Sequence, residues 1–205
     1  MTRIKICGIT HLKDALTAVD AGADALGFIF VPDTPRFVNS DQVAAIVAEL
    51  PPFVTTVGIF ANKDAVKIKT IADQCRLDAV QLHADVTPEF CRNLDKKVIK
   101  VVRVKDESSL SILSDYDVNA FLLDTYVEGK MGGTGEVFDW NLALRAKHYG
   151  RIIVAGGLKP DNVVQAVRRV KPYGVDVGSG VESEPGRKDS DKIRKFVDAV
   201  KSVEV

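Results

Sequence analysis

The most constraining feature of the sequence is an alternation of short apolar runs with amphipathic stretches, repeated about eight times along the 205 residues. The runs are apolar throughout, as in parallel strands that helices cover. No linker or change of composition interrupts the series. An open doubly wound sheet usually has fewer strands, so we expect residues 1–205 to form a single (β/α)8 barrel.

The expected strands cover residues 5–7, 24–30, 53–60, 78–83, 97–104, 120–124, 151–155 and 175–178. The expected helices cover 11–21, 40–49, 64–73, 88–95, 107–113, a short segment from 139, 160–170 and 189–203.

Short motifs suggest how these elements begin. Thr10 and Ser40 are the expected N-caps of the first two helices. An aspartate that follows a helix and enters an apolar strand recurs at Asp24, Asp78 and Asp176. This recurrence indicates that one structural unit is reused along the chain.

The charge balance favours neither a nucleic-acid nor a membrane partner, because Lys+Arg and Asp+Glu both number 28. No signal peptide or membrane-spanning stretch is apparent, so we expect a cytoplasmic protein. Cys7, Cys75 and Cys91 form no CxxC pair and the histidines are scattered, so we expect neither a disulfide nor a metal site. Cys75 and Cys91 fall in helices and are expected to pack.

Two candidates for acid–base chemistry lie where strands end, and these ends meet on one face of a barrel. Asp124 follows an apolar strand, so lost solvation should raise its pKa and let it donate a proton. The alternative is a carboxylate that caps a loop amide. Cys7 at the tip of the first strand is a candidate base facing that acid, or an inert buried thiol.

Glycine-rich turns follow the last two strands, which is the usual phosphate site of this fold. Either turn alone could be structural, but the pair predicts a small phosphorylated substrate. The expected phosphate-binding residues are Gly156, Gly157, Gly178, Ser179 and Gly180.

Three further features have open interpretations. Arg36 either grips a substrate carboxylate bidentately or is a solvated loop residue. His83 is either a hydrogen-bond partner of the substrate or a core histidine. The glycine-rich loop 125–137 is either a lid that excludes water or a plain surface loop.

Several motifs in the same order resemble phosphoribosylanthranilate isomerases of tryptophan biosynthesis, over nearly the whole chain. The resemblance is carried by residues 5–10, 34–37, 80–83, 122–125, 132–135, 138–140, 155–158 and 175–182. Two positions depart from the commonest pattern: Ala84 stands where glycine often occurs, and Gly178 where serine is common.

The resemblance implies a cofactor-free barrel and an Amadori rearrangement, the work of an aldose–ketose isomerase. Asp124 matches the general acid that opens the ribose ring, and Cys7 matches the base that removes the C2′ proton. Arg36 matches the residue that holds the anthranilate carboxylate. The glycine turns match the phosphate site.

Alternatives on the same fold remain open at this point. A metal-dependent sugar-phosphate epimerase would need a set of His and Asp ligands, for which His83 and Asp124 qualify. A bifunctional isomerase of histidine and tryptophan synthesis would normally carry aspartate in place of Cys7. A non-catalytic sensor would keep only the glycine turns. The oligomeric state could be a monomer or a homodimer.

Overall fold

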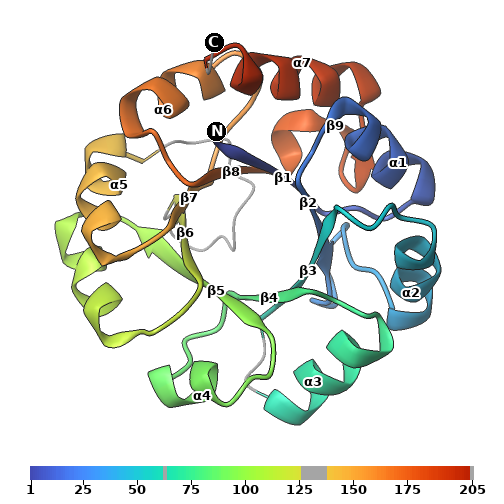
Figure 1. Ribbon diagram of the computed structural model, residues 1–205, viewed down its shortest axis with the longest axis horizontal. Coiled ribbons are helices and arrows are strands. Elements are labelled where there is room, and N and C mark those ends of the chain that lie inside the picture. Colours follow the sequence, from blue (N-terminus) through green and yellow to red (C-terminus); the bar gives the residue numbers. More distant parts are fainter. Residues whose placement is uncertain (62–63, 126–137, 204–205) are drawn as a thin grey trace.

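The computed structural model describes residues 1–61, 64–125 and 138–203. Eight parallel strands close into a barrel in chain order, and β1 pairs with both β2 and β8. Figure 1 looks down this ring and shows the helices surrounding the strands. The predicted (β/α)8 barrel is therefore confirmed. The strands are β1 (Arg3–Cys7), β2 (Ala25–Ile29), β3 (Thr55–Phe60), β4 (Ala79–Leu82), β5 (Lys97–Val104), β6 (Ala120–Thr125), β7 (Ile152–Val154) and β8 (Gly174–Val177).

The helices agree with the predicted series, with differences at several ends. The segment expected as a helix at 107–113 is a 3-10 helix, and the helix expected from residue 160 starts at Val163 because a turn precedes it. The helices are α1 (Leu12–Ala21), α2 (Ser40–Ala48), α3 (Ala65–Gln74), α4 (Pro88–Arg92), α5 (Trp140–Ala146), α6 (Val163–Val170) and α7 (Ser190–Lys201), with 3-10 helices η1 (Glu107–Asp115), η2 (Lys147–Tyr149) and η3 (Ser179–Val181).

A short antiparallel hairpin, β9 (Glu182–Glu184) and β10 (Arg187–Lys188), lies between β8 and α7 and was not expected from the sequence. Its turn lies against the loop after β1, where the Thr10 hydroxyl donates to the Gly186 carbonyl at 2.6 Å. Thr10 is therefore engaged across the molecule and does not cap α1, which corrects the prediction.

The predicted cap of α2 is also wrong, by one position. Ser40 is the first helical residue, and Asn39 before it has an extended backbone. The Asn39 side chain accepts a hydrogen bond from Gln42 N at 2.9 Å, as an N-cap should.

The predicted repeat is real for two of its three members. Asp24 and Asp78 each accept a hydrogen bond from a backbone N–H of the neighbouring strand, at 2.8 and 2.7 Å. Asn119, before β6, accepts the equivalent bond from β5 at 2.8 Å. Asp176 has a different role, because it lies within β8 and pairs with a lysine inside the barrel. The third member of the repeat is thus Asn119.

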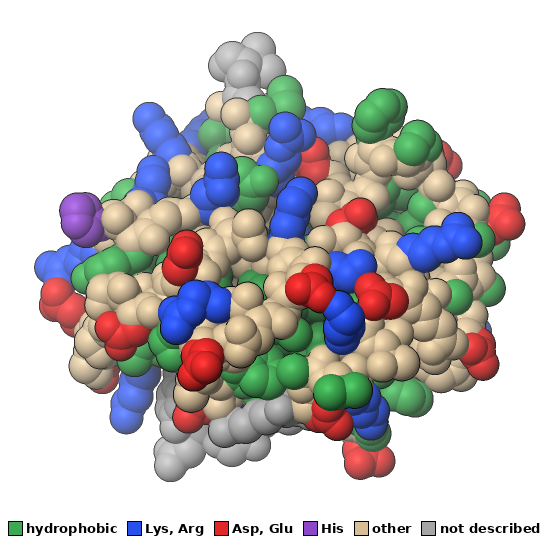
Figure 2. Space-filling model, turned by 60° about the horizontal axis from the view of Figure 1, so that its bottom comes forward, with side chains coloured by type: hydrophobic (Ala, Val, Ile, Leu, Met, Phe, Trp, Pro, Cys, Tyr) green, Lys and Arg blue, Asp and Glu red, His purple; other side chains and the backbone are tan. Residues whose placement is uncertain are grey.

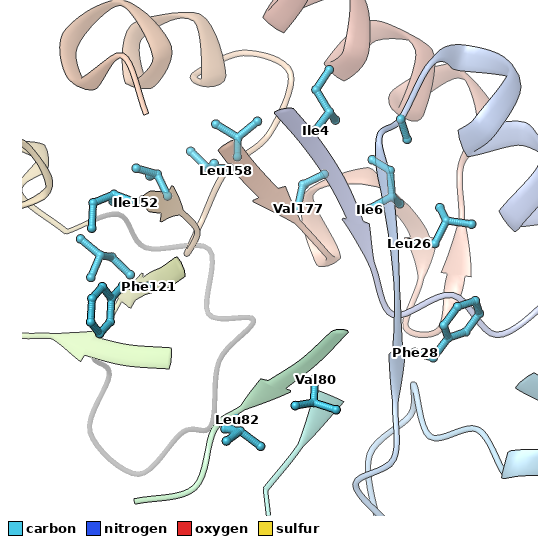
Figure 3. Packing of buried hydrophobic residues seen from close by; sticks show 14 of the residues in the cluster. Ile4, Ile6, Leu26, Phe28, Val80, Leu82, Phe121, Ile152, Leu158 and Val177 are labelled. Atoms are coloured by element: carbon cyan, nitrogen blue, oxygen red, sulfur yellow. The ribbon is translucent and has the colours of Figure 1, made fainter. Parts of the chain in front are cut away.

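Alternation along each strand divides the apolar residues into two clusters. One set faces outward and packs under the helices, as Figure 3 shows for Leu26, Phe28 and Phe121. The other set fills the barrel itself. An inward-facing side chain that lies closer to the strand end than this inner cluster is exposed at the mouth of the barrel. The inner cluster comprises Val57, Ala79, Ile99, Val101, Ala120, Leu122, Ile153 and Ala155.

The surface matches the balanced composition. Lysine and arginine side chains are mixed with acidic ones over the face shown in Figure 2. Across the described ranges, no helix is long and apolar enough to span a membrane.

We predict that Phe196→Ala in α7 lowers the free energy of unfolding by about 3–5 kcal/mol. The ring is fully buried, and with Ile193, Val197 and Val200 it forms the apolar face that closes the outer layer. Urea unfolding would measure the change. The exposed neighbour Lys195→Ala should stay within about 0.5 kcal/mol of wild type, and an equal loss in both variants would contradict the assignment.

Candidate active site

A cavity of about 320 Å³ opens at the C-terminal ends of the barrel strands. Every site residue that the sequence predicted lines this cavity, although these residues come from the ends of β1 and β6 and from the segments after β2, β4, β7 and β8. The predicted set is therefore brought together by the fold. Those residues are Cys7, Arg36, His83, Asp124, Gly156, Gly157, Gly178, Ser179 and Gly180.

Asp124 faces inward near the end of β6, two residues beyond Leu122 of the inner cluster. Burial raises the pKa of this carboxyl to about 6, with a smaller contribution from the negative Asp176. The backbone N–H of Thr125 donates to Asp124 Oδ1 at 2.9 Å and limits the rise. The group thus gains and loses its proton close to neutral pH, as a general acid must.

Gly156, in the turn after β7, makes room for this carboxyl. Its φ of +77° suits glycine, and a Cβ there would collide with Thr125 and lie 2.9 Å from Asp124 Oδ1. The acid therefore packs directly against the first of the two glycine turns.

Cys7 lies at the inward-facing tip of β1, as the sequence predicted, and is partly exposed to the cavity. Burial raises the pKa of its thiol, and the charge of Lys5 opposes that rise. The other two cysteines pack as expected, since Cys75 and Cys91 are 1% and 3% exposed.

A buried ion pair beneath Cys7 was missed by the sequence analysis. Lys5 Nζ lies 2.9 Å from Asp176 Oδ1, and the two residues are direct neighbours across β1 and β8. The alternation of side chains along a strand could have revealed this pair. Lys5 precedes Cys7 by two positions, and Asp176 precedes Gly178 by two, so Lys5 and Asp176 face into the barrel as those site residues do.

Arg36 is held at the rim of the cavity by a residue that the sequence analysis did not assign. Its Nε and Nη2 donate to the two oxygens of Glu182 at 2.8 and 2.6 Å. Lys188 Nζ donates to the same carboxylate at 2.9 Å and to the Gly178 carbonyl at 3.1 Å. Arg36 is therefore no solvated loop residue, and Glu182 joins it to the turn after β8.

His83 lies at the cavity, not in the core. Burial lowers its pKa to about 4, with help from the positive charges of Lys5, Arg103 and Lys100, so the imidazole is neutral. Its Nε2 is 3.0 Å from Gln81 Nε2. An amide nitrogen only donates, so this ring nitrogen accepts and Nδ1 carries the proton.

Gln81 also presents an unused acceptor. Its Oε1 is buried, lines the same cavity and has no hydrogen-bond partner among the residues that the structure describes. Buried polar atoms are normally paired, so a ligand hydroxyl or amine would be stabilised here.

The two glycine turns form one surface. A Cβ at Gly180 would collide with the Leu158 carbonyl, so the turn after β8 packs backbone to backbone on the turn after β7. Asn162 Nδ2 braces the latter by donating to the Gly157 carbonyl at 2.9 Å. A Cβ at Gly178 would meet only Cys7 O at 3.8 Å, so there is room for the serine that is common at this position in the family.

The predicted lid at 125–137 lies outside the described residues, apart from Thr125. Within the described part of the chain, no three His, Cys, Asp or Glu side chains are grouped to hold a metal ion.

The sequence pattern of the family described as N-(5'phosphoribosyl)anthranilate (PRA) isomerase matches residues 4–199. The chain belongs to this family. A curated isomerase of that name from Geobacter sulfurreducens is 55% identical over 197 residues, which cover 96% of this chain and 97% of the relative. The resemblance stated from the motifs is thereby confirmed, and the chain is an isomerase.

Solved structures of the family agree with this fold. The crystal structure of phosphoribosyl anthranilate isomerase from Thermotoga maritima has a TM-score of 0.91 and 42% identity, covering 98% of this chain and all of that one. Another PRA isomerase structure, at 0.88 and 41% with the same coverage, is a complex with reduced 1-(o-carboxyphenylamino)-1-deoxyribulose 5-phosphate.

We predict that the Asp124 carboxyl titrates near pH 6 in the unliganded isomerase, uncharged below and charged above, because burial opposes its charged form. The carbon-13 chemical shift of the carboxyl, followed against pH, measures the midpoint. Asp189, whose pKa is lowered by backbone N–H groups at the start of α7, is the matched control and should titrate below its usual value. An Asp124 midpoint near 4 would contradict the assignment.

Proposed function

We propose that this isomerase converts N-(5'-phosphoribosyl)anthranilate to 1-(2-carboxyphenylamino)-1-deoxyribulose 5-phosphate with Asp124 as acid and Cys7 as base. The observation that carries the proposal is the meeting of these two groups with Arg36 and the glycine turns in one cavity. In the ring of strands, β7 and β8 separate β6 from β1. A substrate in the mouth is therefore approached by the acid and the thiol from different sides.

In the first step Asp124 gives its proton to the ribose ring oxygen. The bond between that oxygen and C1′ breaks, and the anthranilate nitrogen supplies the electron pair that forms the Schiff base. A carboxyl with a pKa of about 6 retains enough of the protonated form near neutrality to serve this step.

In the second step the Cys7 thiolate removes the proton from C2′. The electron pair moves toward the positively charged imine and gives an enolamine, which tautomerises to the ketone. The thiol must ionise to act, so the positive charges close to Cys7 favour this step.

The remaining groups bind and orient the substrate. Arg36, fixed by Glu182, is suited to the anthranilate carboxylate, because a guanidinium group still has donors outside that pair. The turns at Gly156–Gly157 and at 178–180 are suited to the phosphate. Neutral His83 is suited to ribose hydroxyls, and so is Gln81 Oε1, which has no partner within the described ranges. A cytoplasmic location fits a biosynthetic enzyme of this kind.

The alternative functions gain no support from these observations. A metal-dependent epimerase needs a ligand cluster, and the described residues form no such group. A non-catalytic sensor gives no reason for the raised pKa of Asp124 in the same cavity as a thiol. Turnover of phosphoribosylanthranilate in the presence of a chelator tests both alternatives directly.

We predict that Asp124→Asn and Cys7→Ser each lower kcat by about 10²–10⁴-fold, the range of general acid–base catalysis. Asparagine cannot supply the proton, and serine ionises far less readily than cysteine, so Cys7→Ser should keep a small residual rate. The loss of substrate fluorescence measures turnover. Asp115→Asn, on the exposed η1, is the control and should match wild type. Nearly full activity in Asp124→Asn would overturn the acid assignment.

We predict that Arg36→Met raises KM at least about tenfold with a smaller change in kcat, because a charge-assisted hydrogen bond to the substrate is lost. Glu182→Gln should raise KM less, since it weakens the hold on Arg36 but leaves the guanidinium. Steady-state kinetics at varied substrate concentration separate the two constants. Arg187→Met, on the exposed face of β10, is the control, and an unchanged KM in Arg36→Met would contradict the binding role.

A further inference from the structure

We propose that Lys5 is a positioning residue of this isomerase: its ammonium group, held beneath the cavity by Asp176, stabilises the thiolate of Cys7. The inference deepens the proposed function, in which Cys7 is the base. Lys5 is not among the residues that line the cavity, whereas Cys7 and Asp176 are. Its effect on the reaction therefore passes through neighbouring groups, and we assign that role to Cys7.

The geometry places the ammonium group next to the sulfur. Lys5 and Cys7 both face inward on β1, because they are two positions apart. Across the sheet, Gly27 of β2 is the direct neighbour of Cys7. A Cβ at Gly27 would lie 3.0 Å from both Cys7 Sγ and Lys5 Nζ, so the two atoms are separated by no more than twice that distance. A larger residue at this position would push them apart.

The ion pair is enclosed, which strengthens its field. The side chains of Lys5 and Asp176 are only 6% and 9% exposed, and their charged atoms are 2.9 Å apart. Buried ion pairs are poor evidence for stability, since desolvation offsets the attraction. A stabilising role therefore does not explain why this ion pair is buried here, whereas a positive charge beneath a reactive thiol would favour the thiolate.

Four charged groups face Cys7, and they come from four parts of the chain: β1, β8, β10 and the loop after β2. Lys5 and, more weakly, Lys188 favour the thiolate, while Asp176 opposes it. Arg36, which also interacts with Cys7, adds positive charge from the loop after β2. Burial raises the pKa of the thiol, and Lys5 is the strongest of the charges that lower it.

Asp176 ensures that the lysine keeps its charge. Burial alone would favour neutral Lys5, but the carboxylate and Cys7 outweigh burial and raise the pKa of the ammonium group. A permanently charged ammonium under the sulfur then lowers the free energy of the thiolate relative to the thiol.

The test is the pH dependence of Cys7 alkylation by iodoacetamide in the full chain, read by mass spectrometry of the Cys7 peptide. Lys5→Met should move the midpoint up by about one to three pH units, the effect of one opposite charge at this range. It should also lower kcat at least about tenfold at neutral pH with little change in KM. An unmoved midpoint in a folded Lys5→Met variant would overturn the proposal.

A second variant guards against misfolding, because Lys5→Met leaves Asp176 buried without its partner. The double change Lys5→Met with Asp176→Asn removes both charges. The midpoint should still rise, since Lys5 acts on the thiol more strongly than Asp176 does. A purely structural pair predicts a loss of stability with an unchanged midpoint, and that result would count against the proposal.

Lys100→Met is the matched control. Lys100 is as buried as Lys5, at 4% against 5% exposed, but lies on β5 and donates to the Ala84 and Val101 carbonyls. Its loss should leave the Cys7 midpoint unchanged, and an equal rise would show that the effect is not specific to Lys5. Because alkylation needs no substrate, failure of the wild-type chain to turn over phosphoribosylanthranilate would reject the proposed function while leaving this measurement decisive for Lys5.

Discussion

Closure of the parallel sheet into a ring is the constraint on which the rest of this structure depends. Once β1 pairs with β8, each strand has one face inside the barrel and one under the helices. Side chains therefore reach the cavity only from inward positions near the strand ends, or from the loops that follow. Cys7 and Asp124 face inward and lie near the ends of their strands. Lys5 also faces inward, but it lies one layer deeper in the barrel. The position of a residue along its strand, inward or outward and near the end or deeper, therefore decides whether its side chain reaches the cavity.

Within that mouth, burial acts in opposite directions on groups of opposite charge. It raises the pKa of Asp124 from 3.8 to about 6, which corresponds to about 3 kcal/mol against the carboxylate. It lowers the pKa of His83 to about 4 and so keeps the imidazole neutral. The ammonium group of Lys5 adds to the second shift and opposes the first. One buried charge therefore acts electrostatically on Cys7, Asp124 and His83 together.

The sequence was sufficient for the fold and for many of the residues that line the cavity, although not for Gln81 or Asp176, and the reason is local. Cys7, Asp124 and the glycine turns each follow an apolar strand, so position alone indicates their place. Glu182 could not be assigned a partner in this way, because it meets Arg36 across 146 residues. The predicted cap of the first helix failed for a similar reason. Thr10 has the chemistry of a cap, yet its hydroxyl is taken by the distant Gly186.

These long-range contacts around the β9–β10 hairpin have a consequence for how the site comes into being. Thr10 with Gly186, Asp14 with Lys188, and Arg36 with Glu182 join residues 176, 174 and 146 positions apart. Contacts of such separation form slowly, because a long loop must close before any of them contributes. During synthesis, Thr10, Asp14 and Arg36 leave the ribosome long before their partners in the hairpin exist. The carboxylate that orients Arg36 is made 146 residues after it, so the site becomes complete only when the β9–β10 hairpin docks.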